Sequence, residues 1–337
     1  MNKVLKWGFI IIASLVVIII AAILIIPRVV DVQKYKPVLE KKIAEASGRP
    51  FSVSDDLRLS VFPWAGISFS DLQLGNVKGF QEKDFLTIKS FEARIKLLPL
   101  LFKDIQVKKF ILNEPRMVLI KNKDGRVNWE MPKKTAQPKK DEKIPAGKIS
   151  ETSLPVSALW VEDFSIKNGE VLWIDHTSGT RKQLSDINLA LQEVSLDRPV
   201  QLKFSAVLDR QPVSIQGSVG PVGKLQQESV PMDLSLTALN ELTIRLKGAL
   251  KNPAVSPGVE VDLNVAEFSP LKMAAGLGQT FPVATADPQV LNRMALNAHI
   301  KADSKKLSVS NGILGLDDSK LNFSIKTHQK EIQQHHF

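Results

Sequence analysis

The sequence predicts an all-β protein with an N-terminal transmembrane helix, in which a long curled antiparallel sheet of repeated bent hairpins is accompanied by few short helices. Three observations support this fold class. A run of twenty uncharged, mostly aliphatic residues spans Trp7 to Ile26, apolar and polar residues alternate almost continuously from Phe51, and one segment of the chain repeats at a constant offset.

The N-terminal apolar run is long enough to cross a membrane. At a rise of about 1.5 Å per residue, twenty helical residues span roughly the 30 Å hydrocarbon core. A cleaved signal peptide is the alternative, but its apolar region is usually about 7 to 15 residues long. Lys3 and Lys6 favour a cytoplasmic amino terminus. We therefore expect residues 1–30 to form a short tail and an uncleaved anchor, with the rest of the chain outside the cytoplasm.

A short amphipathic helix is expected over residues 31–48. Its apolar residues fall on one stripe, Pro37 lies early in the segment, and Gly48 is placed to end it. The helix has two interpretations: it caps the first edge of the sheet, or it lies on the membrane surface. Edge capping is favoured, because open sheet edges are normally protected.

After the helix, apolar and polar residues alternate with a period of two. This alternation predicts about eighteen strands in two β segments, residues 49–130 and 156–326. Between them, residues 131–155 lack any period and are rich in Pro and Lys, which is typical of a flexible basic linker. Brief helices are expected at 269–276 and 287–294, and residues 327–337 form a polar tail.

The repeat aligns residues 105–125 with residues 159–179 without gaps, at an offset of 54. In both copies the spacing of apolar residues changes from two to three at the same place, between Val107 and Phe110 and between Val161 and Phe164. One additional residue in a strand indicates a β-bulge, which bends the sheet. Each copy is then expected to turn, at Glu114-Pro115 or at Asn168-Gly169, and a further hairpin is expected at 310–314.

Catalytic and metal-binding signals are weak. The chain has no cysteine and five histidines, none at a metal-ligand spacing. The carboxylate pairs at 55–56 and 317–318 flank strand turns, where Asp is favoured by local hydrogen bonding. We therefore expect no enzyme activity, no cofactor and no metal.

The formal net charge of +10 does not predict nucleic-acid binding. Lys3, Lys6 and Arg28 contribute +3, and the segment 131–150 contributes +4 with six lysines and two acids. No basic motif interleaved with aromatic residues occurs elsewhere, so no nucleic-acid partner is expected.

So many strands with so few helices leave one apolar sheet face without an obvious cover. Two arrangements fit the pattern: a β-sandwich, in which two sheets cover each other, or a groove covered by lipid acyl chains. Pattern alone favours the sandwich.

Specific stretches shift this balance: "SGRPFSV", "LSVFPWAGISFSDLQLGN", "LLPLLFKDIQVKKFILNEPRMVLIKNKDGRVNW", "NGEVLWIDHTSGTRKQLSDINLAL" and "VAEFSPLKMAAGLGQTFP". With the N-terminal span, they make the chain resemble the AsmA family of bacterial envelope proteins over most of residues 1–325. The polar end after "LGLDDSKLNFSI" departs from longer relatives.

The resemblance implies an apolar β-groove related to bridge-like lipid transfer proteins, anchored in the inner membrane and projecting into the periplasm. The implied function is passive transfer of phospholipid toward the outer membrane, supporting envelope integrity, with phospholipids and the inner membrane as partners. The alternative is a structural or chaperone-like protein that binds other envelope proteins and assists outer-membrane protein assembly.

The expected groove-lining residues are the apolar residues of the middle strands. An ordinary core is the alternative for each of them: Phe91, Ile95, Val107, Phe110, Leu112, Val118, Ile120, Val161, Phe164, Ile166, Leu172, Ile174, Leu189 and Leu191.

A corner of the groove is expected at Phe62, Pro63 and Trp64, since Pro63 lacks a backbone donor. The apolar positions change from odd to even along this stretch, from Phe69 to Leu72, which supports a bend. Trp64 is expected to plug the groove end or to lie at the membrane interface.

Overall fold

The computed structural model describes residues 32–60, 64–97, 99, 105–130, 159–221, 223, 229–254, 256–279, 290–304 and 306–328. The expected span, corner residues Phe62 and Pro63, the linker and most of the polar tail lie outside these residues. Within them, no helix has both the length and the apolar character needed to cross a bilayer.

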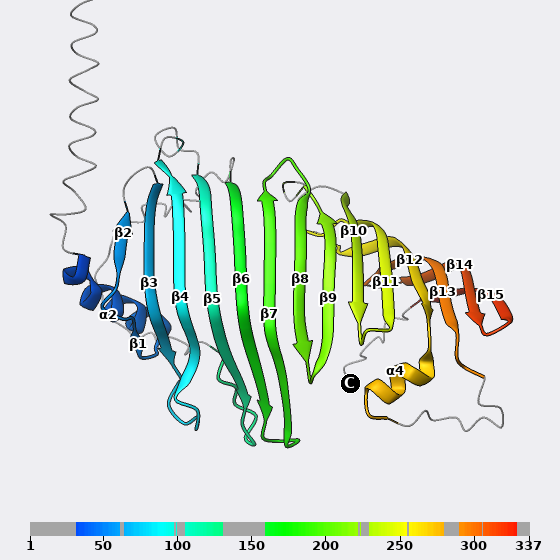
Figure 1. Ribbon diagram of the computed structural model, residues 1–337, viewed down its shortest axis with the longest axis horizontal. Helices are drawn as coiled ribbons and strands as arrows, with labels where there is room; N and C mark the ends of the chain where they lie inside the picture. Colours follow the sequence, from blue (N-terminus) through cyan, green and yellow to red (C-terminus); the bar gives the residue numbers. More distant parts are fainter. Residues whose placement is uncertain are drawn as a thin grey trace, which may run out of the picture. The chain divides into compact units, whose positions relative to one another are not determined.

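The described part of the chain is almost entirely β-structure, as the alternation predicts. It contains fifteen strands, whose chain order Figure 1 follows from blue to red. The elements are η1 (Val32–Tyr35), α2 (Lys36–Ser47), β1 (Phe51–Ser52), β2 (Arg58–Ser60), β3 (Trp64–Gly75), β4 (Asp84–Lys96), β5 (Ile105–Lys121), β6 (Leu159–Asp175), β7 (Thr180–Val194), β8 (Val200–Leu208), β9 (Gln211–Val219), β10 (Ser229–Ala238), β11 (Leu242–Lys251), β12 (Gly258–Phe268), α4 (Pro270–Gly276), β13 (Met294–Asp303), β14 (Lys306–Leu316) and β15 (Ser319–His328).

The chain divides into two compact units, and the division falls within β6 and β7. The first unit is 1–158 with 171–181, and the second is 159–170 with 182–337. The first has the strand order β1-β3-β4-β5-β6, with β2 paired to β3, and the second has the order β6 to β15 in sequence. Most neighbouring strands are antiparallel, with Phe69 opposite Phe91 and Phe204 opposite Ile215. The wholly antiparallel sheet expected from the sequence is nevertheless corrected to a mixed one. His176 N–H, just after the end of β6, donates to the carbonyl of Lys121, the last residue of β5, at 2.8 Å, so these two neighbouring strands end at the same edge and run parallel.

Within the described ranges, all the named strands belong to a single sheet, and no strand belongs to a second one. The β-sandwich interpretation is therefore not supported. A single open sheet leaves its apolar face to be covered by something other than a partner sheet.

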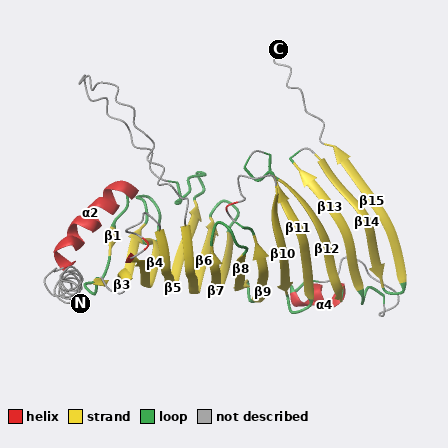
Figure 2. Ribbon diagram, turned by 90° about the horizontal axis from the view of Figure 1, so that it is seen from above, coloured by secondary structure: helices red, strands yellow, loops and turns green. Residues whose placement is uncertain are grey.

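The N-terminal helix is confirmed and contacts the first sheet edge (Figure 2). Gly48 ends α2 with a left-handed φ of 68°. The Glu40 carboxylate accepts a hydrogen bond from Val53 N–H at 3.0 Å, and the Gln33 amide donates to the Asp55 and Leu57 carbonyls. These bonds satisfy backbone groups at the sheet edge, which supports edge capping.

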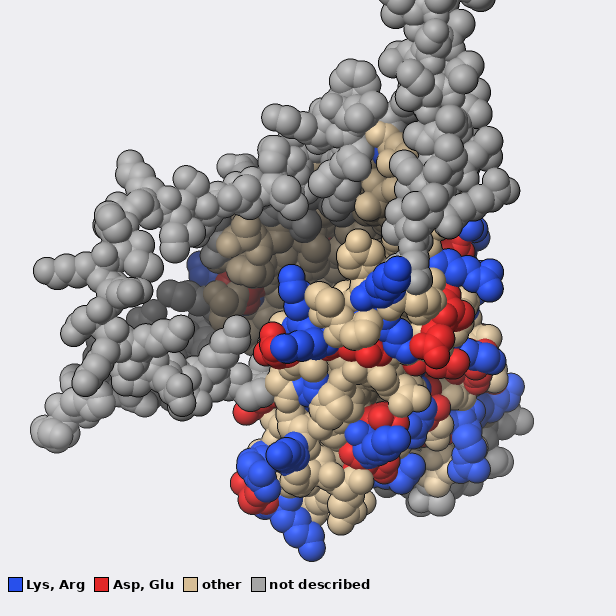
Figure 3. All heavy atoms as spheres, turned by 90° about the vertical axis from the view of Figure 1, so that its left-hand side faces the viewer, with Lys and Arg blue, Asp and Glu red and all other residues tan. Residues whose placement is uncertain are grey.

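Charges of both signs are interspersed on the side of the molecule that carries α2 (Figure 3). Lys36 pairs with Glu40 at 3.9 Å, and Lys41 pairs with Glu45 at 4.0 Å, each one helical turn apart. Such exposed pairs contribute little stability, but they leave this helix without a large basic patch.

The bulge predicted between Val107 and Phe110 is confirmed. Arg94 lies opposite Lys109 and Ile95 lies opposite Val107, so Lys108 is the additional residue of β5. The matching bulge between Val161 and Phe164 remains a prediction.

The hairpin turns expected inside the repeat and at residues 310–314 are wrong. Strands β5 and β6 run unbroken through Glu114-Pro115 and Asn168-Gly169, and β14 runs unbroken through residues 310–314. Glu114 and Asn168 instead have left-handed φ angles of 47° and 52°, and Asn311 has 52°. A single left-handed residue can bend a strand while both flanks stay paired, and a bulge also accommodates proline.

The repeat itself is confirmed in detail. Strand β5 begins and ends 54 residues before β6, and the left-handed residues Glu114 and Asn168 are also 54 apart. Each copy is one long bent strand. This merging of runs is the main reason that the described residues hold fewer strands than expected.

One smaller expectation is corrected, and another is located more closely. Residues 290–294 form a turn and the start of β13, whereas a helix was expected over 287–294; the rest of that segment lies outside the described residues. The change of apolar phase expected between Phe69 and Leu72 coincides with Asp71, which has a left-handed φ of 47°. The corner expected at Phe62 and Pro63 stays a prediction, because these residues lie outside the described ranges.

Candidate functional site

One row of apolar side chains crosses nine strands of the second unit. Directly opposed residues in neighbouring antiparallel strands present their side chains on the same face. The strand register therefore places on one face the residues that we call the apolar row: Leu189, Phe204, Ile215, Leu236, Ile244, Val265, Leu296, Leu314 and Leu321.

The apolar row is open to solvent along much of its length. Most of its members are half-buried, and Leu321 in β15 is 57% exposed. With strands about 4.8 Å apart, a row across nine strands is roughly 40 Å long. A contiguous exposed apolar surface of this extent is rare on soluble proteins and marks a binding surface.

The opposite face of the same strands is polar and internally paired. Asp262 and His299 lie directly opposite each other, with 2.7 Å between the Oδ1 and Nδ1 atoms. Glu260 pairs with Lys301 at 2.6 Å, and the Lys301 ammonium, assisted by Lys251, lowers the pKa of the Glu260 carboxyl. This face is adapted to water, which leaves the apolar face as the candidate site.

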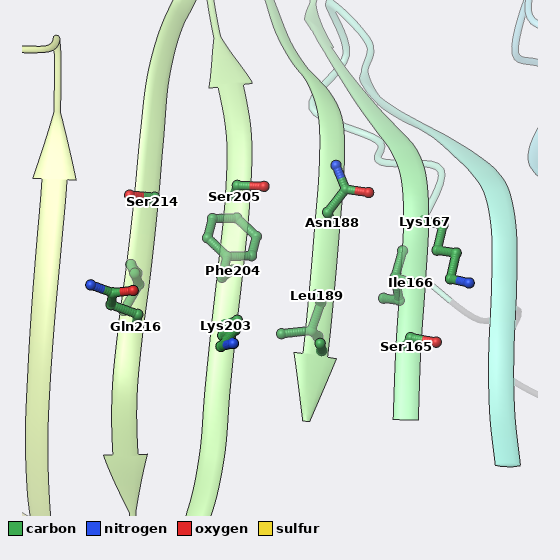
Figure 4. A pocket seen from close by; sticks show the side chains of 12 residues that line it. Ser165, Ile166, Lys167, Asn188, Leu189, Lys203, Phe204, Ser205, Ser214 and Gln216 are labelled. Carbon is green, nitrogen blue, oxygen red and sulfur yellow. The ribbon is translucent and has the colours of Figure 1, made fainter. Parts of the chain in front are cut away.

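A shallow cavity of about 400 Å³ lies where the apolar row begins. Ile166, Leu189, Phe204 and Ile215, from β6 to β9, contribute to its lining. Figure 4 shows Ile166, Leu189 and Phe204 on three successive strands at similar heights. Two of the expected lining residues, Ile166 and Leu189, thus meet here, and Leu191 lies opposite Leu202 in the neighbouring row.

The first unit has a smaller apolar surface of its own. Phe69 and Phe91 lie opposite each other and stack with ring centres 4.8 Å apart, and Phe110 meets Phe91 edge-on at 5.3 Å. Phe91 also lies opposite Leu112, and Ile95 lies opposite Val107. The register therefore brings five expected lining residues, Phe91, Ile95, Val107, Phe110 and Leu112, onto one face.

Other expected lining residues lie in a closed core of the first unit. Val118, Ile120 and Leu172 are each 1% exposed, with Phe80 and Ile174 packed against them. Here the connection between β3 and β4 covers the apolar side chains. Val161 and Phe164 are half-buried residues of β6.

The paired carboxylates make structural hydrogen bonds. The Ser54 and Ser70 hydroxyls and the Ser70 N–H donate to the Asp56 carboxylate and lower its pKa to about 2. Asp317 accepts from the N–H groups of Leu291, Asn292 and Arg293 at 2.7 to 3.0 Å. Across the described ranges, no three His, Asp or Glu side chains gather where they could hold a metal ion.

The expected lining set stopped at β7, although the apolar row continues to β15. Phe204, Ile215 and Leu236 belong to stretches with the same two-residue alternation, so the signal was present. What the sequence did not contain was the register that joins these strands into one row.

The model of the AsmA family matches residues 1–241. A search of curated proteins finds no match to the chain.

Proposed function

Because the chain belongs to the AsmA family, we propose that it binds the acyl chains of phospholipids along the apolar row and moves them passively through the cell envelope, anchored in the inner membrane and directed toward the outer membrane. The single observation that carries this proposal is the unbroken apolar row on an open sheet, with paired polar residues on the reverse face.

The physical argument concerns the cost of moving a lipid through water. Exposing an acyl chain of about sixteen carbons costs about 0.8 kcal/mol per methylene, on the order of 12 kcal/mol. An apolar surface removes most of that cost wherever the chain contacts it. The two-faced sheet provides such a surface while its polar face stays hydrated, and transfer along it needs no catalytic group.

Site-specific photocrosslinking tests the proposal. The full chain is expressed with the photoreactive residue p-benzoylphenylalanine at Phe204, on the apolar row, or at the adjacent Lys203, which faces the opposite side. Phe204 is half-buried and Lys203 is exposed. We expect ultraviolet light to attach phospholipid to the Phe204 variant and to attach little to the Lys203 variant, as measured by mass spectrometry of the labelled peptide.

Equal lipid labelling at the two positions would contradict the proposal. Labelling of another polypeptide at Phe204, with no lipid, would instead favour the chaperone-like function. A matched pair on β9, Ile215 and Gln216, repeats the comparison on the neighbouring strand.

A further inference from the structure

One end of the first unit combines an aromatic residue with several cations. Trp64 begins β3, and its Cα partner is Lys96 at the end of β4. The Lys108 ammonium lies over the Trp64 ring, 5.7 Å from the ring centre. Trp64 and Lys108 thus share a face although β4 separates their strands.

This face is opposite the apolar face of the first unit. The next residue along β3, Ala65, pairs with Ile95, which in turn pairs with Val107, and successive side chains of a strand point to opposite sides. Arg94 lies two residues before Lys96 and opposite Lys109. We call Trp64, Arg94, Lys96, Lys108 and Lys109 the Trp64 surface.

The bulge of β5 concentrates charge here. Lys108 is the additional residue of the bulge, so two consecutive lysines lie beside Arg94 and Lys96. Glu92 is the acid of the same strand end, and it pairs with Arg94. Within β3 to β5, the Trp64 surface thus has four cations beside one acid, in contrast to the alternating charges on α2.

We propose that the Trp64 surface binds the anionic headgroups of a phospholipid membrane. Tryptophan favours the boundary between headgroups and acyl chains, and lysine and arginine are attracted to anionic lipids. The proposed contact is separate from acyl-chain binding, because the Trp64 surface belongs to the first unit and the apolar row belongs to the second.

The absence of cysteine from the chain allows a direct test. Gln106→Cys, which precedes Val107 and so belongs to the side of the Trp64 surface, is labelled with the environment-sensitive dye NBD. The full chain is reconstituted into nanodiscs of phosphatidylcholine, with or without phosphatidylglycerol, and quenching by doxyl-labelled lipid is measured. We expect at least about twofold stronger quenching with phosphatidylglycerol, decreasing as salt is added.

Charge reversal identifies the residues responsible. Lys96→Glu combined with Lys108→Glu is expected to abolish the effect of phosphatidylglycerol. Lys203→Glu combined with Lys247→Glu makes the same change in net charge at two exposed lysines of the second unit and is expected to leave the effect intact. If the Lys96→Glu, Lys108→Glu variant does not fold, the milder variant Lys96→Gln with Lys108→Gln is used in its place. The salt titration of the unchanged chain then provides a second test of the same charges.

Equal quenching in the two lipid compositions would overturn the proposal. An equal loss of the phosphatidylglycerol effect in the control variant, Lys203→Glu with Lys247→Glu, would also overturn it. Displacement of the labelled chain by a short nucleic-acid duplex, with no response to phosphatidylglycerol, would also overturn it in favour of nucleic-acid binding. Photocrosslinking at Phe204 does not depend on the Trp64 surface, so failure of this proposal is distinguishable from failure of the lipid-transfer function.

Discussion

The guanidinium of Arg49 donates a hydrogen bond to the main-chain carbonyl of Asn128, 79 residues further along the chain. Arg49 is 5% exposed and lies over the Phe85 ring at 4.3 Å, while Asn128 is fully buried. The contact links the segment after α2 to the turn after β5 and holds the first unit together at this end.

Replacing Arg49 is expected to destabilise the first unit. Arg49→Ala removes a buried hydrogen bond from a charged donor and the contact with Phe85, at a cost of about 2 to 3 kcal/mol. Arg49→Lys keeps the charge but loses the planar stacking, so an intermediate loss is expected. Urea unfolding of the full chain measures both, with exposed Arg58→Ala as the control. A loss as large for Arg58 would show that the effect is not specific to the contact.

Asn128 completes the backbone pairing of β5. Its side-chain oxygen accepts from Ile120 N–H at 2.7 Å, and its amide donates to the Val118 carbonyl at 2.8 Å. Asn128→Ala leaves both buried groups unsatisfied, and we expect a loss of about 3 kcal/mol in unfolding free energy. The control, Asn113→Ala, removes one half-buried bond to Ser90, so a loss below about 1 kcal/mol is expected. Comparable losses would contradict the role assigned to Asn128.

Asp56 makes stability depend on acid pH. The folded-state pKa of Asp56, about 2, lies below the ordinary 3.8. The ionised carboxylate therefore stabilises the folded state above pH 4, and this stabilisation disappears as the pH falls through about 2. Solvent screening limits the contribution to about 1 kcal/mol. In urea titrations across this range, the stability difference between the unchanged chain and Asp56→Asn is expected to narrow as the pH falls.

Ser70→Ala provides the control for the Asp56 prediction. It removes one hydroxyl donor, so Asp56 is expected to titrate at a higher pH and the narrowing to move with it. A stability difference that stays constant from neutral pH to pH 2 would contradict the assignment.

Glu114 occupies a left-handed bend and not a turn. Its φ of 47° disfavours β-branched side chains, so Glu114→Val is expected to cost about 1 to 2 kcal/mol. Glu114→Asn is expected to be nearly neutral, because asparagine tolerates this conformation and the exposed pair with Lys89 contributes little. Gln73→Val, in an exposed extended position of β3, should be tolerated. Urea midpoints test all three, and equal effects of the two valines would refute the bend.

A charged residue in the apolar row is expected to affect lipid more than folding. Ile215 is half-buried, so Ile215→Lys should cost below about 2 kcal/mol, yet it places an ammonium where an acyl chain is proposed to lie. Phospholipid that co-purifies with the full chain should fall sharply in this variant and remain unchanged in Gln216→Lys. Global unfolding of Ile215→Lys would instead indicate an ordinary core position.

Local patterns predicted the all-β character of the chain, α2 with its glycine end, the bulge between Val107 and Phe110, and the repeat between residues 105 and 179. These features depend on side-chain alternation and on backbone preferences within a few residues, and such preferences can be read from the chain directly. The same reasoning failed at Glu114 and Asn168. A left-handed residue serves a hairpin and a bent strand equally well, and only pairing with the neighbouring strands distinguishes them.

The amino-acid order alone established which side chains alternate and therefore which of them share a face within one strand. The three-dimensional pairing of strands established which faces join. Phe204 and Leu321 are more than a hundred residues apart in sequence, yet both belong to the open apolar row. Val118 lies in a stretch with the same alternation of apolar and polar residues, but it is buried against Phe80 of the connection between β3 and β4. Burial depends on what packs above a residue, and that neighbour is distant in sequence.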